Sequence, residues 1–459
     1  MREPREARRR TGRRHAPRPP LRTAAIVALA AAALGCSDAS RVPQDLPCTG
    51  GPDGSPPAAS YLLLRQDVLT NADYWESEPR ILAAGLGFTD IIGVPGLAAD
   101  DLETQRLAVL DAGGAWNIVV TSQPTIPQRA YTSAATPQGV ANSYGWPVQF
   151  CDGLPIEFSW PVRPSTVDGS DFRVFLNDGT VVTPLVASIN PNLEFNERST
   201  VVIFGEFGNR LAPDEPGARY PVRFEIIADE TPLELIGPGG RVASAVGLTY
   251  GDGTAPLTAY APGRGPTLVA AKLSRMSVAG EGAPAAFGAQ MPNDGVALYG
   301  PDAAYRLRIL TTGGFSPDGV RSVLPTEFAR YFRLIAVDAA GREHVIEEAG
   351  RSYTIDGGTL SVLGLADLGV AQSSYDDAYV EDHDNQIDIV LAGDEVAMRT
   401  IRLVEIPAAD GYSPFYNPGG PGNDPQPGTI YSEPGPPTRQ PVTLALDDPM
   451  TVDWPPPAP

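Results

Sequence analysis

Apolar and polar side chains alternate along several short segments in the middle of the chain. The alternation is clearest at residues 156–160 and 172–176, and strand-like patterns return at 200–204 and 220–226. A period of two residues is typical of strands that bury one face. The sequence therefore predicts at least four strands in this part of the chain.

A turn follows the second of these segments. Residues 172–176 lead into Asn177-Asp178-Gly179 and then into a short apolar run at 180–182. Gly179 can adopt a positive φ angle, so the pattern predicts a β-hairpin. Pro221 has no amide hydrogen to donate, and we expect it at a strand edge or at a bulge.

Strand patterns return nearer the C-terminus. They lie at residues 305–310, 331–337, 386–391 and 400–406. A second β-rich domain at residues 296–407 is the economical interpretation. The preceding part, residues 231–295, is rich in Gly, Ala and Pro and carries scattered strand patterns.

The N-terminal part of the folded chain, residues 61–150, has a mixed pattern. Apolar runs at 61–64 and 116–120 predict buried strands, whereas the apolar spacing at 98–111 predicts a helix. Asp100 and Asp101 would suit the positive amino end of that helix. We expect a mixed α/β module here.

Four short segments between residues 151 and 230 carry a family resemblance. They are residues 154–162, 165–168 and 172–174, and Leu211 followed by residues 220–222. Together they resemble a bacterial Ig-like domain of the surface-layer type. The resemblance implies a β-sandwich fold and says almost nothing about function. The segment 196–210 is not typical of that class, and the sequence gives it no role.

Length and composition extend this picture to the whole chain. The sequence has 459 residues, with 48 glycines and 48 prolines, and 15 of the prolines fall in the last 53 residues. This composition is typical of short strands joined by many turns, and the length predicts two or three domains. We therefore predict a mainly β protein with two or more Ig-like β-sandwich domains, an N-terminal mixed segment and a disordered Pro-rich tail at residues 408–459.

The first 60 residues have the layout of a bacterial lipoprotein leader. Nine arginines precede an apolar run at residues 23–35 that is too short to span a membrane. Ala33-Leu34-Gly35-Cys36 resembles a lipobox, which implies that residues 1–35 are a signal peptide and that Cys36 is lipidated. Cleavage by an ordinary signal peptidase is the alternative. Residues 36–60 are a Pro/Gly-rich spacer, and Ser37 resembles the sorting signal of lipoproteins destined for the outer membrane or cell surface.

The mature protein is strongly acidic. Removal of residues 1–36 leaves 25 basic and 53 acidic residues, a formal charge of −28. Such a surface repels phosphate backbones, so we expect no nucleic-acid partner. Lys272 is the only lysine in the chain.

Two cysteines remain after Cys36. Cys48 and Cys151 can form a disulfide in an oxidising compartment, and two free thiols are the alternative. They do not have the spacing of a zinc site.

The densest acidic cluster is the candidate metal site. Closely spaced carboxylates are the ligands that Ca²⁺ prefers, but the spacing here does not match an EF-hand loop. A solvated loop of an acidic protein is the alternative. The candidate calcium ligands are Asp376, Asp377, Asp382, Asp384 and Asp388.

No catalytic motif is detectable in the sequence. The mature chain has two histidines, His344 and His383, and no GxSxG sequence. We therefore predict an envelope-anchored lipoprotein that serves non-enzymatic binding, adhesion or scaffolding. Its expected partners are the membrane, through the lipid anchor, and an envelope protein or polysaccharide. The alternatives are a secreted hydrolase of esters or glycans and a calcium-stabilised binding module.

Overall fold

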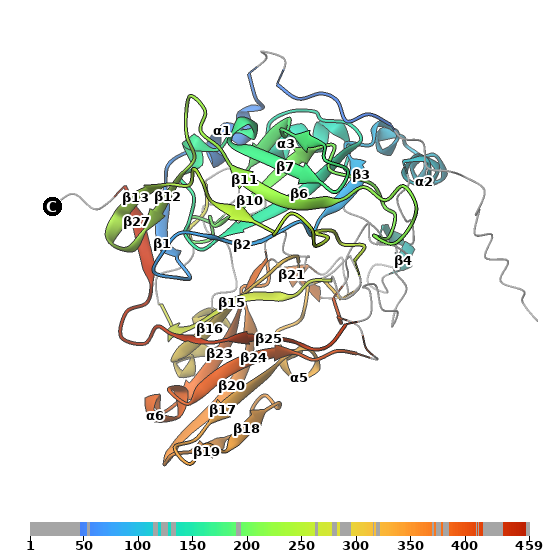
Figure 1. The fold of residues 1–459 in the computed structure, drawn as a ribbon. Helices are drawn as coiled ribbons and strands as arrows, with labels where there is room; N and C mark the ends of the chain where they lie inside the picture. The colour runs from blue at the N-terminus through green and yellow to red at the C-terminus, as the bar shows by residue number, and fades with distance from the viewer. Residues whose placement is uncertain are drawn as a thin grey trace, which may run out of the picture. The chain divides into compact units, whose positions relative to one another are not determined.

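The computed structural model describes most of the chain from residue 46 onward. The described residues are 46–52, 56–112, 118–120, 127–129, 135–189, 194–261, 265–277, 282–284, 295–314, 316–317, 322–369, 371–372, 378–379, 385–409, 411, 413–415 and 435–455. They fall in one compact unit, which begins at Pro43. Strands outnumber helices among them, as predicted for a mainly β protein (Figure 1). Residues 1–35, predicted to be a signal peptide, and Cys36 lie outside the described residues.

Two sheets around one core form what we call the N-terminal sheet pair. The order is β2-β6-β10-β9 in the five-stranded sheet, with β3 also paired to β6, and β14-β11-β7-β8 in the four-stranded sheet. Both contribute to a cluster around Phe158, Trp160 and Phe172. The strands are β2 (Ile81–Ala84), β3 (Phe88–Ile92), β6 (Cys151–Phe158), β7 (Phe172–Leu176), β8 (Val181–Val182), β9 (Val186–Ser188), β10 (Thr200–Gly205), β11 (Pro221–Ile226) and β14 (Thr249–Tyr250).

The predicted turn features are present in this sheet pair. β7 and β8 form an antiparallel hairpin, and Gly179 has a φ of 86°. The register of β11 against β7 shifts next to Pro221, which marks a bulge. β6 differs from the expected half-buried strand because both of its faces are covered. Ile156 packs in the shared core and Cys151 in a second apolar cluster on the other side.

Two further sheets form the C-terminal sheet pair. Their strand orders are β19-β20-β23-β16-β15-β26 and β18-β17-β24-β25, and they share a second large apolar core. The strands are β15 (Leu268–Arg275), β16 (Tyr305–Thr311), β17 (Arg333–Val337), β18 (Glu343–Ile346), β19 (Tyr353–Ile355), β20 (Gly358–Ala366), β23 (Gln386–Gly393), β24 (Ile401–Ile406), β25 (Thr438–Pro441) and β26 (Thr443–Leu444).

The remaining strands form two-stranded ribbons. They are β1 (Leu69–Asp73) with β27 (Thr451–Trp454), β12 (Glu234–Gly237) with β13 (Arg241–Ser244), β4 (Ile118–Val120) with β5 (Pro127–Arg129), and β21 (Ala371–Gln372) with β22 (Ala378–Tyr379).

The helices are short. They are α1 (Ala59–Leu64), α2 (Leu102–Asp111), α3 (Pro137–Tyr144), α4 (Gly295–Tyr299), α5 (Phe328–Tyr331) and α6 (Glu395–Met398), with 3-10 turns η1 (Pro95–Ala98), η2 (Pro164–Thr166), η3 (Gly169–Asp171), η4 (Pro238–Gly240) and η6 (Gly300–Asp302). Among the described residues, no helix is long and apolar enough to cross a membrane.

Two local predictions concern these helices. The helix predicted at 98–111 is α2, and Asp101 caps it by accepting a hydrogen bond from the Thr104 amide at 2.8 Å. The strand predicted at 61–64 was wrong, because these residues belong to α1. Tyr61 and Leu64 are buried one helical turn apart while Leu62 is exposed, so the apolar run serves one face of a helix.

The C-terminal segment is a further difference from the sequence prediction. Part of the tail expected to be disordered forms β25, β26 and β27, which pair with β24, β15 and β1 respectively. Leu446 and Val452 are buried, and this apolar anchoring offsets the ordering cost. The proline in β25 is tolerated because the strand lies at a sheet edge.

Cys48 and Cys151 form a disulfide, as one of the two sequence alternatives proposed. Their α-carbons are 4.5 Å apart, and 103 positions separate them in the sequence. Cys151 is the first residue of β6, so the bond attaches the segment around Cys48 to a central strand of the five-stranded sheet.

We expect reduction of this disulfide to destabilise the body strongly. A closed loop of this length lowers the entropy of the unfolded chain, and its opening should cost about 4 to 5 kcal/mol of unfolding free energy. Urea unfolding with and without reductant measures the difference. In the double variant Cys48→Ala/Cys151→Ala, reductant should have no further effect, and an equal effect there would contradict the assignment.

Candidate functional site

A row of charged side chains crosses three neighbouring strands of the C-terminal sheet pair. Lys272 on β15 is directly opposite Arg308 on β16, which in turn is opposite Asp388 on β23. Residues opposite one another in a sheet project to the same face. In β16 the apolar residues Leu307 and Ile309 fill the core, so Arg308 must point to the other face.

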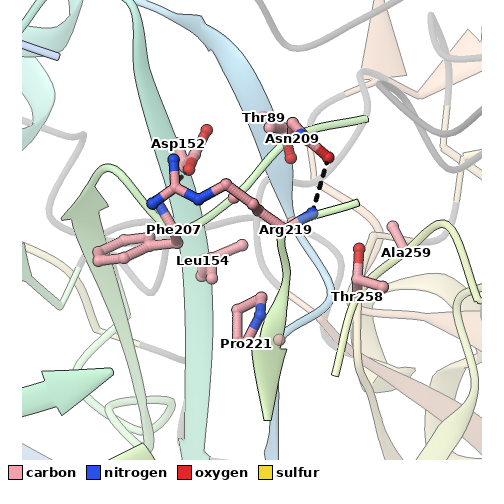
Figure 2. A pocket seen from close by; sticks show the side chains of 12 residues that line it. Thr89, Asp152, Leu154, Phe207, Asn209, Arg219, Pro221, Thr258 and Ala259 are labelled. Atoms are coloured by element: carbon pink, nitrogen blue, oxygen red, sulfur yellow. Dashed lines mark hydrogen bonds between the residues drawn. The ribbon is translucent and has the colours of Figure 1, made fainter. Parts of the chain in front are cut away.

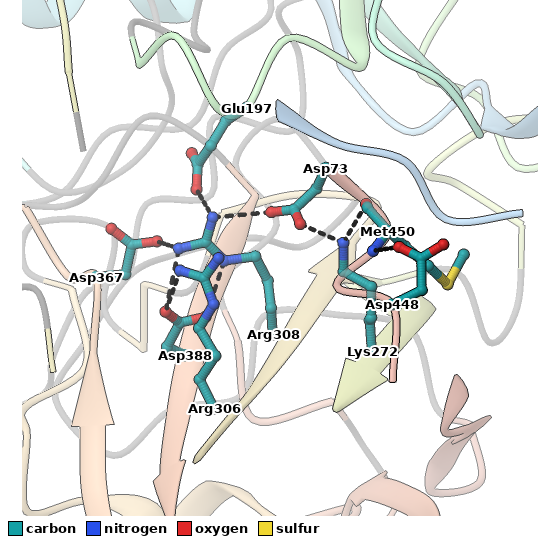
Figure 3. A network of polar contacts seen from close by, with 9 residues as sticks. All are labelled: Asp73, Glu197, Lys272, Arg306, Arg308, Asp367, Asp388, Asp448 and Met450. Carbon is teal, nitrogen blue, oxygen red and sulfur yellow. Dashed lines mark hydrogen bonds and ion pairs between the residues drawn. The ribbon is translucent and has the colours of Figure 1, made fainter. Parts of the chain in front are cut away.

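Arg308 is the centre of a buried ion network (Figure 3). Its side chain is fully buried, and its guanidinium donates to Asp388 from Nε at 2.8 Å and to Asp367 from Nη2 at 2.7 Å. Nη1 donates to Asp73 Oδ2 at 2.9 Å and lies 3.4 Å from Glu197 Oε1. Arg306 adds a second contact to Asp388 at 3.4 Å. Four carboxylates thus surround one cation.

Lys272 extends the network to a second cation. Its Nζ is paired with Asp73 Oδ1 and donates to the carbonyl oxygen of Met450 at 2.7 Å. The rings of Tyr74 and Trp75 lie 6.0 and 5.6 Å from Nζ, within the range of cation–π attraction. Both partners of the Lys272–Asp73 pair are 1% exposed.

Burial and charge set the protonation states of this pair. Burial alone would raise the pKa of Asp73, but the charges of Lys272, Arg308 and Arg306 outweigh it and lower that pKa to about 2. Desolvation lowers the pKa of Lys272 to about 8, against the opposing attraction of Asp73. Both groups are therefore charged at neutral pH, Lys272 by a narrow margin.

A second polar contact links the two sheet pairs. Asn385, beside β23, donates from Nδ2 to Glu157 Oε1 on β6 at 2.7 Å, and Thr200 Oγ1 lies 3.4 Å from Asn385 Oδ1. Glu157 is 1% exposed. Desolvation raises its pKa to about 8, although the bond from Asn385 opposes the rise. Glu157 is therefore mostly protonated at neutral pH.

The segment that the sequence left without a role contributes a buried arginine. Arg198 is fully buried and donates from Nη1 to the carbonyl oxygens of Leu64 at 2.9 Å and Gln66 at 3.2 Å. Desolvation lowers its pKa to about 10, so it stays charged at neutral pH. These hydrogen bonds fix the loop that leads into β1. The last residue of β1 is Asp73, which belongs to the ion network.

The pocket shown in Figure 2 is small and polar. Asp152, Asn209 and Thr258 are among the residues that line it, and its free volume is about 10 Å³. That is room for about one water molecule. Asp152 accepts from the amides of Asp90, at 2.8 Å, and Phe207. Desolvation, followed by the charge of Asp90, raises its pKa well above the ordinary range.

The residues predicted as calcium ligands are only partly described. Asp388 lies in β23 and pairs with Arg308 and Arg306, whereas Asp376, Asp377, Asp382 and Asp384 lie outside the described residues. Within the described part of the chain, no three His, Cys, Asp or Glu side chains are grouped so as to hold a metal ion. The calcium site stays a prediction.

The structure describes one of the two histidines of residues 37–459. His344 Nε2 lies 3.0 Å from Asp338 Oδ2 on the hairpin of β17 and β18, and His383 is outside the described residues. The hydrogen bond from His344, together with bonds from Arg342, lowers the pKa of Asp338.

Sequence analysis did not identify the ion network. In the pattern of β16, Arg306 and Arg308 alternate with apolar residues, as they would on a solvent-facing strand. The signal that could have found them is the unusual isolation of Lys272 as the only lysine, set within an apolar strand.

We expect Arg308→Met to destabilise the protein by about 3 to 5 kcal/mol, because it leaves several carboxylates buried without their cation. Arg275→Met is the matched control on β15. Arg275 is 57% exposed in its pair with Glu395, so its loss should cost less than about 1 kcal/mol. Urea unfolding of the two variants measures the difference, and equal costs would contradict the central role of Arg308.

We expect Glu157→Gln to change how stability depends on pH. The pKa of Glu157 is raised from 4.5 to about 8, so between these values the unfolded state releases a proton that the folded state keeps. Wild-type stability should therefore fall as pH rises through this window, and the variant should lack this fall. Its stability relative to wild type should increase from acid to alkaline pH.

Unfolding midpoints at several pH values check this expectation. Glu395→Gln is the control, because hydrogen bonding to Arg399 lowers the pKa of this half-buried carboxyl. Its difference from wild type should change little between about pH 5 and pH 8. A Glu157→Gln difference that stays constant over the same range would show that Glu157 is ionised in the folded protein.

Comparison with known proteins identifies no relative, so a functional assignment depends on the side chains described above. No family model matches the chain, and neither a curated protein nor a solved structure matches it.

Proposed function

We propose that this protein is a non-enzymatic lipoprotein, anchored in the cell envelope through Cys36, whose β-rich body serves scaffolding or adhesion. One observation carries the proposal. The disulfide attaches Cys48, twelve positions after the lipobox cysteine, to Cys151 at the start of β6. Tension on a lipid anchor would pass through this bond into a central strand without pulling on the residues between the two cysteines.

The ion network supports a structural role for the body. Its cations and carboxylates are buried and directed at one another, and the pocket at Asp152 has room for about one water molecule. Buried ionic groups contribute little net stability but can favour one arrangement of the chain over others. We infer that the network keeps the two sheet pairs in a fixed arrangement, as a scaffold requires.

The proposal includes an Ig-like identity for part of the body. In residues 151–230, β6, β9 and β10 lie in one sheet and β7, β8 and β11 in another, with Trp160 buried in their common core. This layering supports an Ig-like sandwich, and the sheets of residues 296–407 support a second one.

The partners follow from surface charge. The mature chain carries a formal charge of −28. We propose an envelope protein or polysaccharide as the ligand, since nucleic acids would be repelled. The outer membrane or cell surface is the proposed location.

We expect Cys36→Ser to abolish membrane attachment. The variant lacks the thiol that receives the lipid, so it should move from the membrane to the soluble fraction and lose incorporation of a labelled fatty acid. Ser37→Ala is the control and should retain both properties. Wild-type protein without the fatty-acid label, or a Cys36→Ser protein that stays in the membrane fraction, would contradict the anchor.

The non-enzymatic part of the proposal has its own test. Turnover of an ester or glycan by the purified protein, abolished by one point substitution, would contradict it.

A further inference from the structure

The Lys272–Asp73 pair has the geometry of a reactive pair as well as of an ion pair. Nζ of Lys272 contacts Oδ1 of Asp73, while Oδ2 of the same carboxylate accepts from Arg308 Nη1 at 2.9 Å. Both side chains are 1% exposed. The two residues that follow Asp73 are aromatic, and their rings lie near Nζ of Lys272. An amine and a carboxyl group are thus held together away from bulk water (Figure 3).

We propose that Lys272 and Asp73 condense into an intramolecular amide that covalently joins β15 to β1. The inference is independent of the lipid anchor. It assigns a modification site to the only lysine in the chain.

The reaction needs no reagent beyond the two side chains. A proton passes from the Lys272 ammonium to Asp73 Oδ1 across their contact, which leaves a neutral amine beside a neutral carboxyl group. The Nζ lone pair then attacks Cγ, an N–C bond forms, and the negative charge moves to Oδ2. A second proton passes from nitrogen to Oδ1, the Cγ–Oδ1 bond breaks, and Oδ1 leaves as water. The product is an amide whose carbonyl oxygen is Oδ2.

Arg308 is placed to assist this step. Its Nη1 donates to Oδ2, the atom on which negative charge develops, and a fixed donor at that position stabilises the tetrahedral intermediate. The carbonyl oxygen of Met450, which accepts from Nζ at 2.7 Å, holds the amine in position. Arg308 therefore touches the reacting atoms.

Two physical effects favour condensation here. Well-oriented neighbouring groups reach effective concentrations of about 10⁵ M or more, which drives a condensation that is unfavourable in dilute water. Amide formation also removes one buried cation and one buried anion together. The net charge of the network stays the same, because one positive and one negative charge are lost together. Arg308 retains its contacts to Asp367 and Asp388. The lowered pKa of Lys272 favours the neutral amine, whereas the lowered pKa of Asp73 opposes the neutral carboxyl group, so the contact with Arg308 and the geometry of the pair must supply the rest.

Peptide mass spectrometry of the mature protein tests the proposal directly. Trypsin cleaves after arginine and free lysine, so the linked protein should give a branched peptide of residues 66–80 and 265–275. Its mass should equal the sum of the two peptides less one water, with no cleavage after Lys272. Complete cleavage after Lys272, with residues 66–80 recovered as a linear peptide, would overturn the proposal.

Lys272→Arg is the matched control. A guanidinium keeps the positive charge but stays protonated, so it cannot attack the carboxyl group. The variant should release residues 66–80 at full mass. Loss of one water from those residues in the variant as well would place the modification elsewhere and would also overturn the proposal. The wild-type measurement stands whether or not the variant folds.

Discussion

The burial of Arg308 constrains more of this structure than any other single interaction. A guanidinium that is fully removed from water needs acceptors for its hydrogen bonds. Around Arg308 these are carboxylates from β1, β23, the residue after β20 and the loop before β10. Because a buried charge without its partners is costly, each of these segments must be in place at the same time. The ion network therefore couples the position of the β1–β27 ribbon to the packing of the C-terminal sheet pair.

The C-terminal segment and the disulfide act on the same body from its two ends. β25, β26 and β27 are edge additions to three different sheets, and Met450 between the last two presents its carbonyl oxygen to Lys272. The disulfide holds the chain near Cys48 to β6. The Glu157–Asn385 contact is a further link between residues that are distant in the sequence.

Sequence reasoning succeeded where the determinants are local. The hairpin at Gly179 and the register shift at Pro221 each depend on the conformational limits of one residue, so they could be predicted from it. The acidic start of α2 could be predicted from the positive end of the helix, whereas the choice of Asp101 as the cap came from the structure. It failed at residues 61–64 and in the last part of the chain. A four-residue apolar run fits either a helix face or a strand, and proline content indicates disorder only where no partner strand and no buried apolar contact offset the ordering cost.

The sequence by itself determined the mainly β character, the turn positions and the pairing possibility of the two cysteines, because backbone preference and residue type are properties of short segments. Only the tertiary structure decided that Lys272, Arg308 and Asp388 lie in one row. It also decided that Asp73, from another sheet, pairs with Lys272 and Arg308. Alternation along β16 shows that two arginines share a face but not whether that face meets water or carboxylates. That choice depends on strands that are distant in the sequence, and it separates an ordinary exposed face from the charged centre of the fold.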